Sequence, residues 1–304
     1  VRAFVRPESD LSKLKPLPIE FAFGSLENRN EVQQAVKDMD VVYHIAALYR
    51  AANVPDSVYR QVNVEGTRHL LDAALDGNVK RFVHCSTCGV HGNIKNPPAA
   101  EDYPVDPEDI YQETKAEAEE LALSYYQKHA LPVTVVRPVG IYGPGDTRML
   151  KMYRMVRNGR FIMFGGGDVY YHLTFVTDTV EGFRLAGERE KAVGNVYIIA
   201  GETYTTLNEF AGLIADEFGV KPPRFHPPVW PLYAVAFLCE KICIPLRIEP
   251  PVFRRRVHIF THDRAFDISK AKKELGFQPR IDMKEGIHRT AQWYKEKGYL
   301  KGEL

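Results

Sequence analysis

Two cysteines and two histidines crowd the stretch RFVHCSTCGVHG, residues 81–92, and could together bind a metal or exchange a disulfide. A structural zinc site needs four ligands that converge as a tetrahedron. His84 and Cys85 are neighbours at the end of a predicted strand, so their side chains point to opposite faces. The other two cysteines, Cys239 and Cys243, lie far along the chain. We therefore expect no metal at this stretch and interpret its cysteines as buried free thiols.

The same stretch contains hydroxyl groups that could act on a substrate oxygen. Thr87, with Ser86 as the weaker candidate, follows the predicted strand, and Tyr111 and Lys115 share one face of a helix predicted further on. A tyrosine with its usual pKa of about 10 is a poor base at neutral pH until a nearby ammonium group lowers that pKa. The spacing of Tyr111 and Lys115 is a weak signal alone, but its context at a strand end favours a hydroxyl-based site.

The elements that must position these residues alternate between strand and helix. Short apolar runs rich in β-branched and aromatic residues predict strands at residues 1–6, 19–24, 41–47, 81–86 and 132–138. Helical patterns lie between these runs, at residues 28–39, 62–77 and 113–129. Asn28 or Asn30 could cap the first helix. The alternation predicts an α/β fold, with a doubly wound parallel sheet buried under helices on both faces.

After about Gly143 the pattern becomes irregular. Glycine clusters and proline-rich segments interrupt it, and we expect a smaller α+β region there. The predicted domains are residues 1–165 and 166–304, with part of 173–200 returning to the first domain.

The composition restricts the partners and the compartment. The chain has 304 residues, 45% of them hydrophobic, with 40 basic and 39 acidic side chains. This balance provides no broad electrostatic field, so we expect no nucleic-acid partner. Four cysteines fit a reducing compartment, and without a visible signal peptide we predict a cytoplasmic protein.

Two local features remain open. The apolar segment at residues 229–246 is short for a bilayer and is interrupted by prolines and charges, so we expect a buried or interfacial helix rather than a stable membrane span. The triplet Arg254–Arg255–Arg256 suits either a solvated helix face with ion pairs or a pocket for an anionic substrate.

Seven segments in a fixed order resemble the extended short-chain dehydrogenase/reductase superfamily, in its NAD-dependent epimerase/dehydratase branch. They are VVYHIAA, QVNVEGTRHLLDAA, CSTCGVHG, YQETKAEAE, VVRPVGIYGPGD, YYHLTFVTDTVEG and FDISKAKKELGFQPRIDMKEGIHRT. The resemblance covers nearly the whole chain. It implies a Rossmann-like cofactor domain at residues 1–165, a substrate-binding region at 166–304, NAD or NADP as cofactor, and commonly a homodimer.

The resemblance also implies roles for single residues. Tyr111 would be the acid/base, Lys115 would lower its pKa and bond the nicotinamide ribose, and Thr87 would hold the reacting oxygen. The implied cofactor ligands are Arg6, Ser25, Leu26, Ala46, Ala47, Asn63, Tyr111, Lys115, Pro138, Val139 and Ile141. The implied substrate ligands are Thr87, Cys88, Tyr111, Tyr171, His172, Arg256 and Arg264. For two of these residues a structural role is the alternative, because Asn63 could cap a helix and His172 could be a packing histidine.

Several departures from the family pattern limit what can be transferred. The G-x-x-G-x-x-G turn that holds the cofactor pyrophosphate is not in this sequence, and the chain opens on what resembles the second strand. We therefore expect the first β–α unit to be missing, as in a fragment. Arg6 stands where relatives that prefer NAD usually have an acidic residue, which leaves NADP an equal option.

Other departures bear on the reaction. The acidic pair that runs water elimination in sugar-nucleotide dehydratases is replaced by Cys88 and Gly89, so we do not expect a dehydratase. Tyr171 and His172 replace the usual Arg-Asp pair of sugar-nucleotide enzymes. The leading hypothesis is an NAD(P)-dependent oxidoreductase of the nucleotide-sugar epimerase type, acting at a secondary alcohol. The alternatives are a 3β-hydroxysteroid dehydrogenase-like or dihydroflavonol reductase-like enzyme acting on a sterol- or flavonoid-like alcohol, and a non-catalytic dinucleotide-sensing protein.

Overall fold

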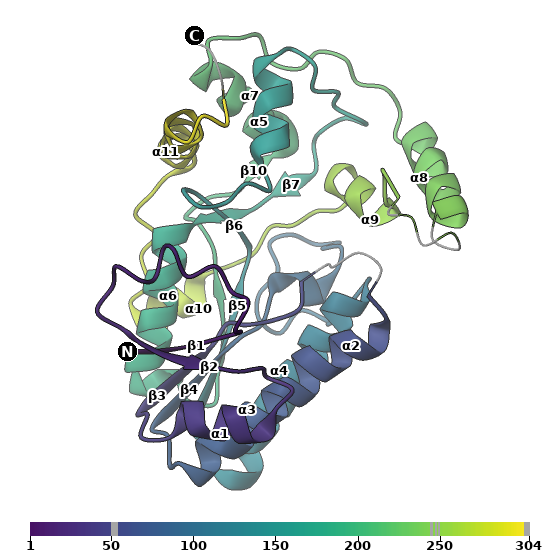
Figure 1. Cartoon of the computed structure of the whole chain (residues 1–304). Coiled ribbons are helices and arrows are strands. Elements are labelled where there is room, and N and C mark those ends of the chain that lie inside the picture. Colours follow the sequence, from purple (N-terminus) through teal and green to yellow (C-terminus); the bar gives the residue numbers. More distant parts are fainter. Residues whose placement is uncertain (50–53, 244–245, 247, 249, 301–304) are drawn as a thin grey trace. The chain divides into compact units, whose positions relative to one another are not determined.

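The computed structural model describes the chain except for residues 50–53, 244–245, 247, 249 and 301–304 (Figure 1). The chain forms two compact units. The first comprises Val1–Val90, Pro107–Arg137 and Phe183–Val196, and the second comprises His91–Asp106, Pro138–Gly182 and Tyr197–Leu304. The chain thus leaves the first unit near residue 137 rather than 165, because Tyr142, Leu150 and Tyr153 pack in the core of the second unit.

The first unit is built on parallel strands, as the sequence predicts for an α/β fold. Its strands are β1 (Arg2–Val5), β2 (Glu20–Phe23), β3 (Val41–His44), β4 (Arg81–Cys85) and β5 (Val133–Pro138), with β9 (Val196–Ile199) beginning at its end. The order is β1-β2 in one sheet and β3-β4-β5-β9 in another. Strands β3, β4 and β5 are parallel and in register, with Val42 opposite Phe82 and Phe82 opposite Val133.

The helical segments of the first unit match the predicted patterns with one exception. They are α1 (Arg29–Val36), α2 (Asp56–Arg60), a π-helix (Gln61–Glu65), α3 (Gly66–Asp76) and α4 (Ile110–His129), with short 3-10 turns at Cys88–His91 and Glu190–Ala192. Asn28 caps α1, and its side chain accepts hydrogen bonds from the N–H groups of Asn30 and Glu31. The exception is the helix predicted at 62–77, which begins earlier and is interrupted by the π-helix.

Helices cover both faces of β3. Val42 points into a core formed by Leu70, Leu71 and Ala74 of α3 together with Ala122 of α4, and α1, α3 and α4 lie side by side in Figure 1. On the opposite face, the Tyr43 hydroxyl lies against Gly187, near the end of α6 (Val176–Glu188). The sheet is therefore doubly wound, as predicted.

Burial of the strands is less complete than their apolar sequences predict. β4 and β5 are buried almost throughout, whereas Val41 and Tyr43 of β3 are 38% and 42% exposed. The difference follows from the pairing: among the described residues β3 is the last strand of its sheet, and β1 and β2 pair only with each other.

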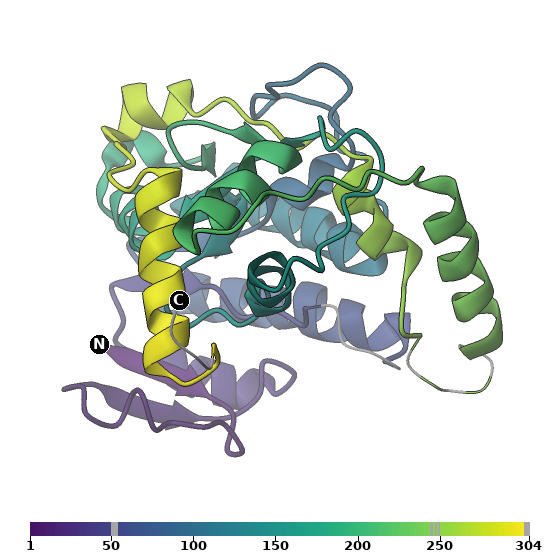
Figure 2. The same ribbon diagram turned by 90° about the horizontal axis from the view of Figure 1, so that it is seen from above.

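The second unit combines helices with small, two-stranded sheets, in agreement with the α+β region that the sequence predicts. Its strands are β6 (Gly140–Tyr142), β7 (Tyr170–Tyr171), β8 (Leu173–Phe175) and β10 (Thr205–Thr206), paired as β6-β8 and β7-β10. Its helices are α5 (Leu150–Arg157), α7 (Leu207–Glu217), α8 (Trp230–Cys243), α9 (Arg254–Val257), α10 (Ser269–Leu275) and α11 (Met283–Glu296), with a 3-10 turn at His258–Phe260. Helices α5, α7 and α11 share one core, and they lie near each other in both views (Figures 1 and 2).

Two helical glycines of the second unit allow a matched stability test. A Cβ on Gly286 of α11 would overlap the Tyr142 hydroxyl, whereas a Cβ on Gly212 of α7 would meet nothing within 4 Å. Alanine is favoured over glycine in a helix by about 1 kcal/mol. We expect Gly212→Ala to raise the urea midpoint and Gly286→Ala to lower it, because the buried ring must shift. An increase for both variants would contradict the close packing at Gly286.

Candidate active site

The first turns of α4 hold the predicted acid/base pair. Asp109 caps the helix by accepting a hydrogen bond from the N–H of Gln112 at 2.9 Å, so Tyr111 lies in the first turn. Tyr111 is half-buried, and its ring meets that of Tyr49 edge-on with 4.9 Å between centroids. Lys115 follows one turn later and is only 2% exposed. A tyrosine near solvent is thus backed by a lysine inside the protein.

Lys115 lies in an unusual electrostatic environment. Burial lowers the pKa of its ammonium group, whereas Cys85 and Glu119 act in the opposite direction. Two buried histidines are also close enough to interact with it: burial lowers the pKa of His44 to about 3 and that of His84 well below its ordinary value, and the charge of Lys115 lowers both further. Both imidazoles are therefore neutral at physiological pH.

Glu119 is the counter-charge that accompanies Lys115 in the core. It lies one turn further along α4 and forms a bidentate ion pair with Arg137 of β5, with 3.0 Å between Arg137 Nε and Glu119 Oε2 and a second bond from Nη2 to Oε1. Both side chains are about as buried as Lys115, at 7% and 6% exposed. The pair anchors α4 to the sheet, and its carboxylate favours the charged form of Lys115.

Asn63 braces α4 from a different direction. It lies in the π-helix and is 1% exposed. Its Oδ1 accepts a hydrogen bond from the Leu48 N–H at 2.7 Å, while its Nδ2 donates to the Leu48 carbonyl at 3.2 Å and to Thr114 Oγ1 at 3.0 Å. Asn63 therefore links the segment after β3 to the residue that precedes Lys115. It does not cap a helix, and both amide hydrogens are used within the protein.

Thr87 lies beside the first turn of α4. It follows β4, and its hydroxyl accepts a hydrogen bond from the Gly89 N–H at 3.0 Å. A Cβ on Gly89 would be 3.3 Å from Thr87 Oγ1 and 3.5 Å from Gln112 Nε2, so the Thr87 loop packs against the residue that follows Tyr111. Ser86 is less suitable because its hydroxyl is buried and 2% of the residue is exposed.

The cysteines of the first unit are free thiols, as expected. Cys88 is 3% exposed, and its thiol donates to the Arg137 carbonyl at 3.2 Å. Burial raises the pKa of Cys85, while the charge of Lys115 acts in the opposite direction. The contacts of Cys88 point into the protein, so its predicted substrate contact lacks structural support and a role as a proton shuttle does not fit.

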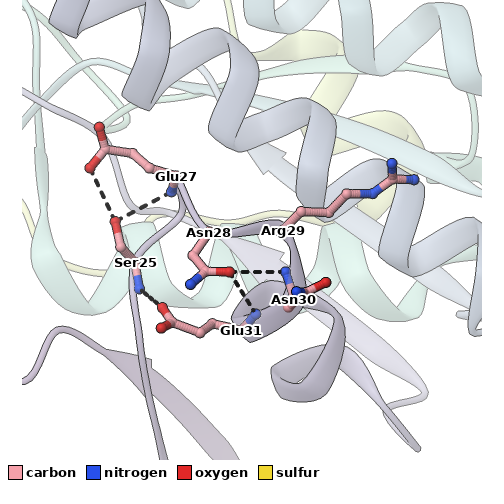
Figure 3. Close-up of a pocket in the computed structure, with 6 residues that line it drawn as sticks. All are labelled: Ser25, Glu27, Asn28, Arg29, Asn30 and Glu31. Carbon is pink, nitrogen blue, oxygen red and sulfur yellow. Dashed lines mark hydrogen bonds between the residues drawn. The ribbon is translucent and has the colours of Figure 1, made fainter.

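The predicted cofactor ligands follow the carboxyl ends of parallel strands. Arg6 follows β1 and is paired with Glu8 at 3.3 Å, Ser25 follows β2, and Ala46 and Ala47 follow β3. Such strand ends are where doubly wound sheets bind dinucleotides. Close to Ser25 the surface forms an open hollow lined by residues 25 and 27–31 (Figure 3).

The hollow shows what the β2 end offers a ligand. The Ser25 N–H donates to Glu31 at 2.8 Å and its hydroxyl to Glu27 at 3.2 Å. Leu26 packs in the α1/α3 core and its carbonyl accepts from His69 at 2.8 Å, which is a structural role. The small residues Ala46 and Ala47 after β3, exposed and half-buried, are compatible with NAD(P) in this unit, and so are the basic residue after β1 and the buried Lys115.

The remaining predicted residues belong to the second unit. Pro138 and Val139 are buried, and the Val139 N–H donates to the Ile199 carbonyl at 3.1 Å. Ile141 is half-buried in β6, and its carbonyl accepts from Arg148 at 2.8 Å. The Arg256 guanidinium lies 5.2 Å from the Phe253 ring.

Tyr171 and His172 are integrated into the second unit. Tyr171 pairs with Thr205 and, through an isolated bridge, with Arg264. His172 is 3% exposed; its Nε2 lies 2.9 Å from the Gly201 carbonyl, and its Nδ1 accepts from the Phe266 N–H at 3.2 Å. Both ring nitrogens are occupied by backbone, and burial lowers the pKa of His172 to about 4. These contacts favour the packing alternative over a substrate ligand.

The sequence did not single out three residues near Lys115 or its ion pair, namely His44, Glu119 and Arg137, and it considered His84 only as a metal ligand. One signal in the sequence could have revealed the ion pair. Glu119 carries a charge one turn after Lys115, within a helix that the sequence places against a sheet. A carboxylate at that position has to be paired.

A family model for the NAD dependent epimerase/dehydratase family matches residues 2–200. The chain belongs to this family. The match confirms the predicted resemblance and covers every element of the site on α4 and β4. The family is NAD-dependent by its description.

Curated relatives of this epimerase/dehydratase chain carry out varied reactions. A 3beta-hydroxysteroid-dehydrogenase/decarboxylase (isoform 1) of Arabidopsis thaliana is 31% identical, over 90% of this chain and 66% of its own length. The chain spans about half (51%) of the second isoform. A dTDP-glucose 4,6-dehydratase of Streptomyces antibioticus is 32% identical, over 91% of this chain and 77% of its own length. An N-acetyl-alpha-D-glucosaminyl-diphospho-ditrans,octacis-undecaprenol 4-epimerase of Escherichia coli O157:H7 is 28% identical, over 89% of this chain and 82% of its own length.

Solved structures agree with the fold. The crystal structure of gox2253 is 31% identical, with a TM-score of 0.82, over 99% of this chain and 92% of the other. A second structure is a DesIV double mutant, a dTDP-glucose 4,6-dehydratase from Streptomyces venezuelae with NAD and DAU bound. It is 25% identical, with a TM-score of 0.73, over 95% of this chain and 84% of the other. These similarities confirm the predicted Rossmann-like α/β class.

The Glu119–Arg137 pair predicts a measurable effect on Lys115. In Glu119→Gln the carboxylate that favours the charged lysine is lost and Arg137 stays buried without its partner. We expect a stability loss of about 3 kcal/mol and an alkaline limb of the pH–rate profile that moves to lower pH. Glu120→Gln, an exposed neighbour on α4, is the control and should change neither. An unshifted pH profile in Glu119→Gln would contradict an action through Lys115.

Burial of neutral His172 predicts acid sensitivity. Its folded pKa of about 4 lies below the unfolded value of 6.5, so the unfolded chain binds more protons between these values. Stability should fall as the pH drops from 6.5 to 4, by up to about 3 kcal/mol for this group. His172→Gln should flatten this part of the stability–pH curve, whereas His129→Gln, at an exposed position, should keep it. An unchanged slope in His172→Gln would contradict the assignment.

Proposed function

We propose that the protein is an NAD(P)-dependent oxidoreductase that transfers a hydride at a secondary alcohol or ketone, with Tyr111 as the acid/base. The main support is the burial of Lys115 with its counter-ion Glu119, one helical turn behind Tyr111. An isolated buried lysine is costly, and a structural helix would not need one at this position. Its ammonium group can lower the pKa of a tyrosine that must lose a proton near neutral pH.

In this mechanism the residues of the chain perform the proton transfer. NAD(P), when bound, supplies the hydride chemistry. Tyr111, as the tyrosinate, accepts the proton of the substrate alcohol as the carbon is oxidised, and in the reverse direction its hydroxyl returns that proton. Thr87 holds the reacting oxygen by a hydrogen bond, and Lys115 favours the tyrosinate. Asn63 maintains the position of α4 through Thr114.

The buried thiol of Cys88 argues against one family reaction. Water elimination from a sugar requires a further acid and base beside Thr87 and Tyr111. Here the next side chain is a thiol that donates to a backbone carbonyl, and Gly89 has no side chain. We therefore favour reactions that need one proton-transferring residue, namely epimerisation through a keto intermediate or net dehydrogenation.

Nucleotide-sugar epimerisation is the first candidate within this class. The arginines at positions 256 and 264 of the second unit could bind a diphosphate, and an epimerase of Escherichia coli O157:H7 is among the relatives. Net dehydrogenation of a sterol-like alcohol is the second candidate. It is favoured by the Arabidopsis relative, which aligns with 90% of this chain, and by the structural role of His172, which removes one expected polar ligand.

Arg6 leaves the choice of cofactor to experiment. Its exposed guanidinium after β1 could pair with the 2′-phosphate of NADP. We further propose, from the sequence, that the protein is cytoplasmic and forms a homodimer.

The decisive variant is Tyr111→Phe in the full-length protein. Incubation with NAD or NADP and a panel of UDP-sugars, GDP-sugars and sterols identifies the substrate by absorbance at 340 nm and by product analysis. With that substrate, Tyr111→Phe should lower turnover by about 10²- to 10⁴-fold, because the proton transfer is lost. Cofactor affinity should change little.

Tyr126→Phe is the matched control, since this tyrosine is exposed on the same helix; it should retain wild-type turnover. Isomerised sugar without net NAD(P)H supports the epimerase, whereas stoichiometric NAD(P)H from a sterol supports the dehydrogenase. Near-normal turnover of Tyr111→Phe would refute the mechanism.

A further inference from the structure

Helix α8 of the second unit exposes large apolar side chains to solvent. Trp230 is 72% exposed, Leu238 56% and Ile242 60%. Tyr233, Val235 and Phe237 of the same helix are exposed as well, and so are the nearby Phe225, Leu246 and Ile248. Both views show α8 at the edge of the second unit (Figures 1 and 2). Large apolar side chains exposed in such number on one short helix often mark an interaction site.

The opposite face of α8 meets the protein mainly through smaller apolar side chains. Ala236 is its one buried residue among those described, and Leu232, Cys239 and Cys243 are half-buried at helical spacing around it. Glu240 lies on this side too and pairs with Arg254 of α9 at 2.6 Å. A helix at the surface of a water-soluble protein turns its large apolar residues inward. In α8 most of the large apolar residues face solvent, in addition to the apolar residues on its inner face.

Cationic side chains lie on the exposed apolar face and next to it. Lys241 lies 5.7 Å and Arg254 5.5 Å from the Phe237 ring, and Arg255 and Arg256 stack on Phe253. Across the described residues of α8 and α9, Glu240 is the one carboxylate among these four cations. Long basic side chains that lie along apolar surface can keep their charges at a polar boundary.

We propose that α8 is an interfacial helix that binds this protein to the surface of a bilayer containing anionic phospholipids. The apolar face would enter the boundary between headgroups and acyl chains, and the basic residues would contact lipid phosphates. A helix of 14 residues is about 21 Å long and cannot cross a hydrocarbon core of about 30 Å. Among the described residues no helix is long and apolar enough to do so.

The charges favour a lipid surface over a second copy of the chain. A two-fold interface through α8 would bring the same arginine-rich border from both copies together, and like charges would oppose association. Anionic headgroups complement that border. The proposal concerns where the protein resides and does not depend on the reaction at Tyr111.

Vesicle flotation of the full-length protein tests the proposal. We expect flotation with phosphatidylcholine vesicles that contain phosphatidylglycerol, weakened by added salt. The double variant Leu238→Glu/Ile242→Glu should lose most of this binding, and Arg255→Gln should weaken it about fivefold. Val180→Glu is the matched control, because Val180 is 61% exposed on another helix; it should float like the wild type.

Tryptophan fluorescence gives an independent readout. The chain has two tryptophans, and Trp293 packs against the core of the second unit. Vesicles should shift the emission of Trp230 to the blue, and Trp230→Phe should remove the shift. Absence of flotation on anionic vesicles would overturn the proposal. It would also be overturned by a dimer, seen in sedimentation, that Leu238→Glu/Ile242→Glu dissociates without vesicles.

Discussion

The buried ammonium group of Lys115 is the constraint on which the first unit depends. Removing such a charge from water costs several kcal/mol unless other charges and hydrogen bonds compensate. Glu119 on the same helix offsets part of this cost, although burial still lowers the pKa of Lys115, and Arg137 holds Glu119 from the sheet. The three charges therefore lock α4 onto β5. A small movement of the helix would expose one of them to an environment in which it has no partner.

A second set of hydrogen bonds fixes the same helix from the side of β3. His44 contacts Thr67 at 2.8 Å, Thr67 donates to the Asn63 carbonyl at 2.6 Å, and Asn63 reaches Thr114. Strand, π-helix and α4 thus form one continuous polar path through the core. Buried networks that are fully paired stabilise a single arrangement, because every alternative leaves a group unsatisfied. The proton transfer that we propose for Tyr111 would benefit from that rigidity.

The sequence predicted the features that depend on local pattern. Apolar runs located the five strands, and Asn28 was one of the two residues foreseen as a cap, since both signals come from a few neighbouring residues. The Glu119–Arg137 pair was missed because its partners come from different elements and only packing reveals that both are buried. The predicted boundary at residue 165 lies later in the chain than the end of the first unit near residue 137, for a related reason. Tyr142 and Tyr153 join the core of the second unit because they pack against helices that are distant in the sequence. The outward face of α8 could not be read from hydrophobicity, which does not say which side of a helix meets solvent.

The π-helix at Gln61–Glu65 has a consequence for how this chain can vary. One extra residue in a helical turn rotates everything after it by about 100° relative to an uninterrupted α-helix. α2 and α3 are therefore out of phase, and the apolar stripe of α3 meets the core only because of this insertion. A deletion of one residue here would restore a regular helix and leave Leu70 and Leu71 facing the core, whereas straightening the turn at its present length would rotate them away. The residue most affected by such a deletion would be Asn63, whose bonds to Leu48 and Thr114 depend on its place in this turn.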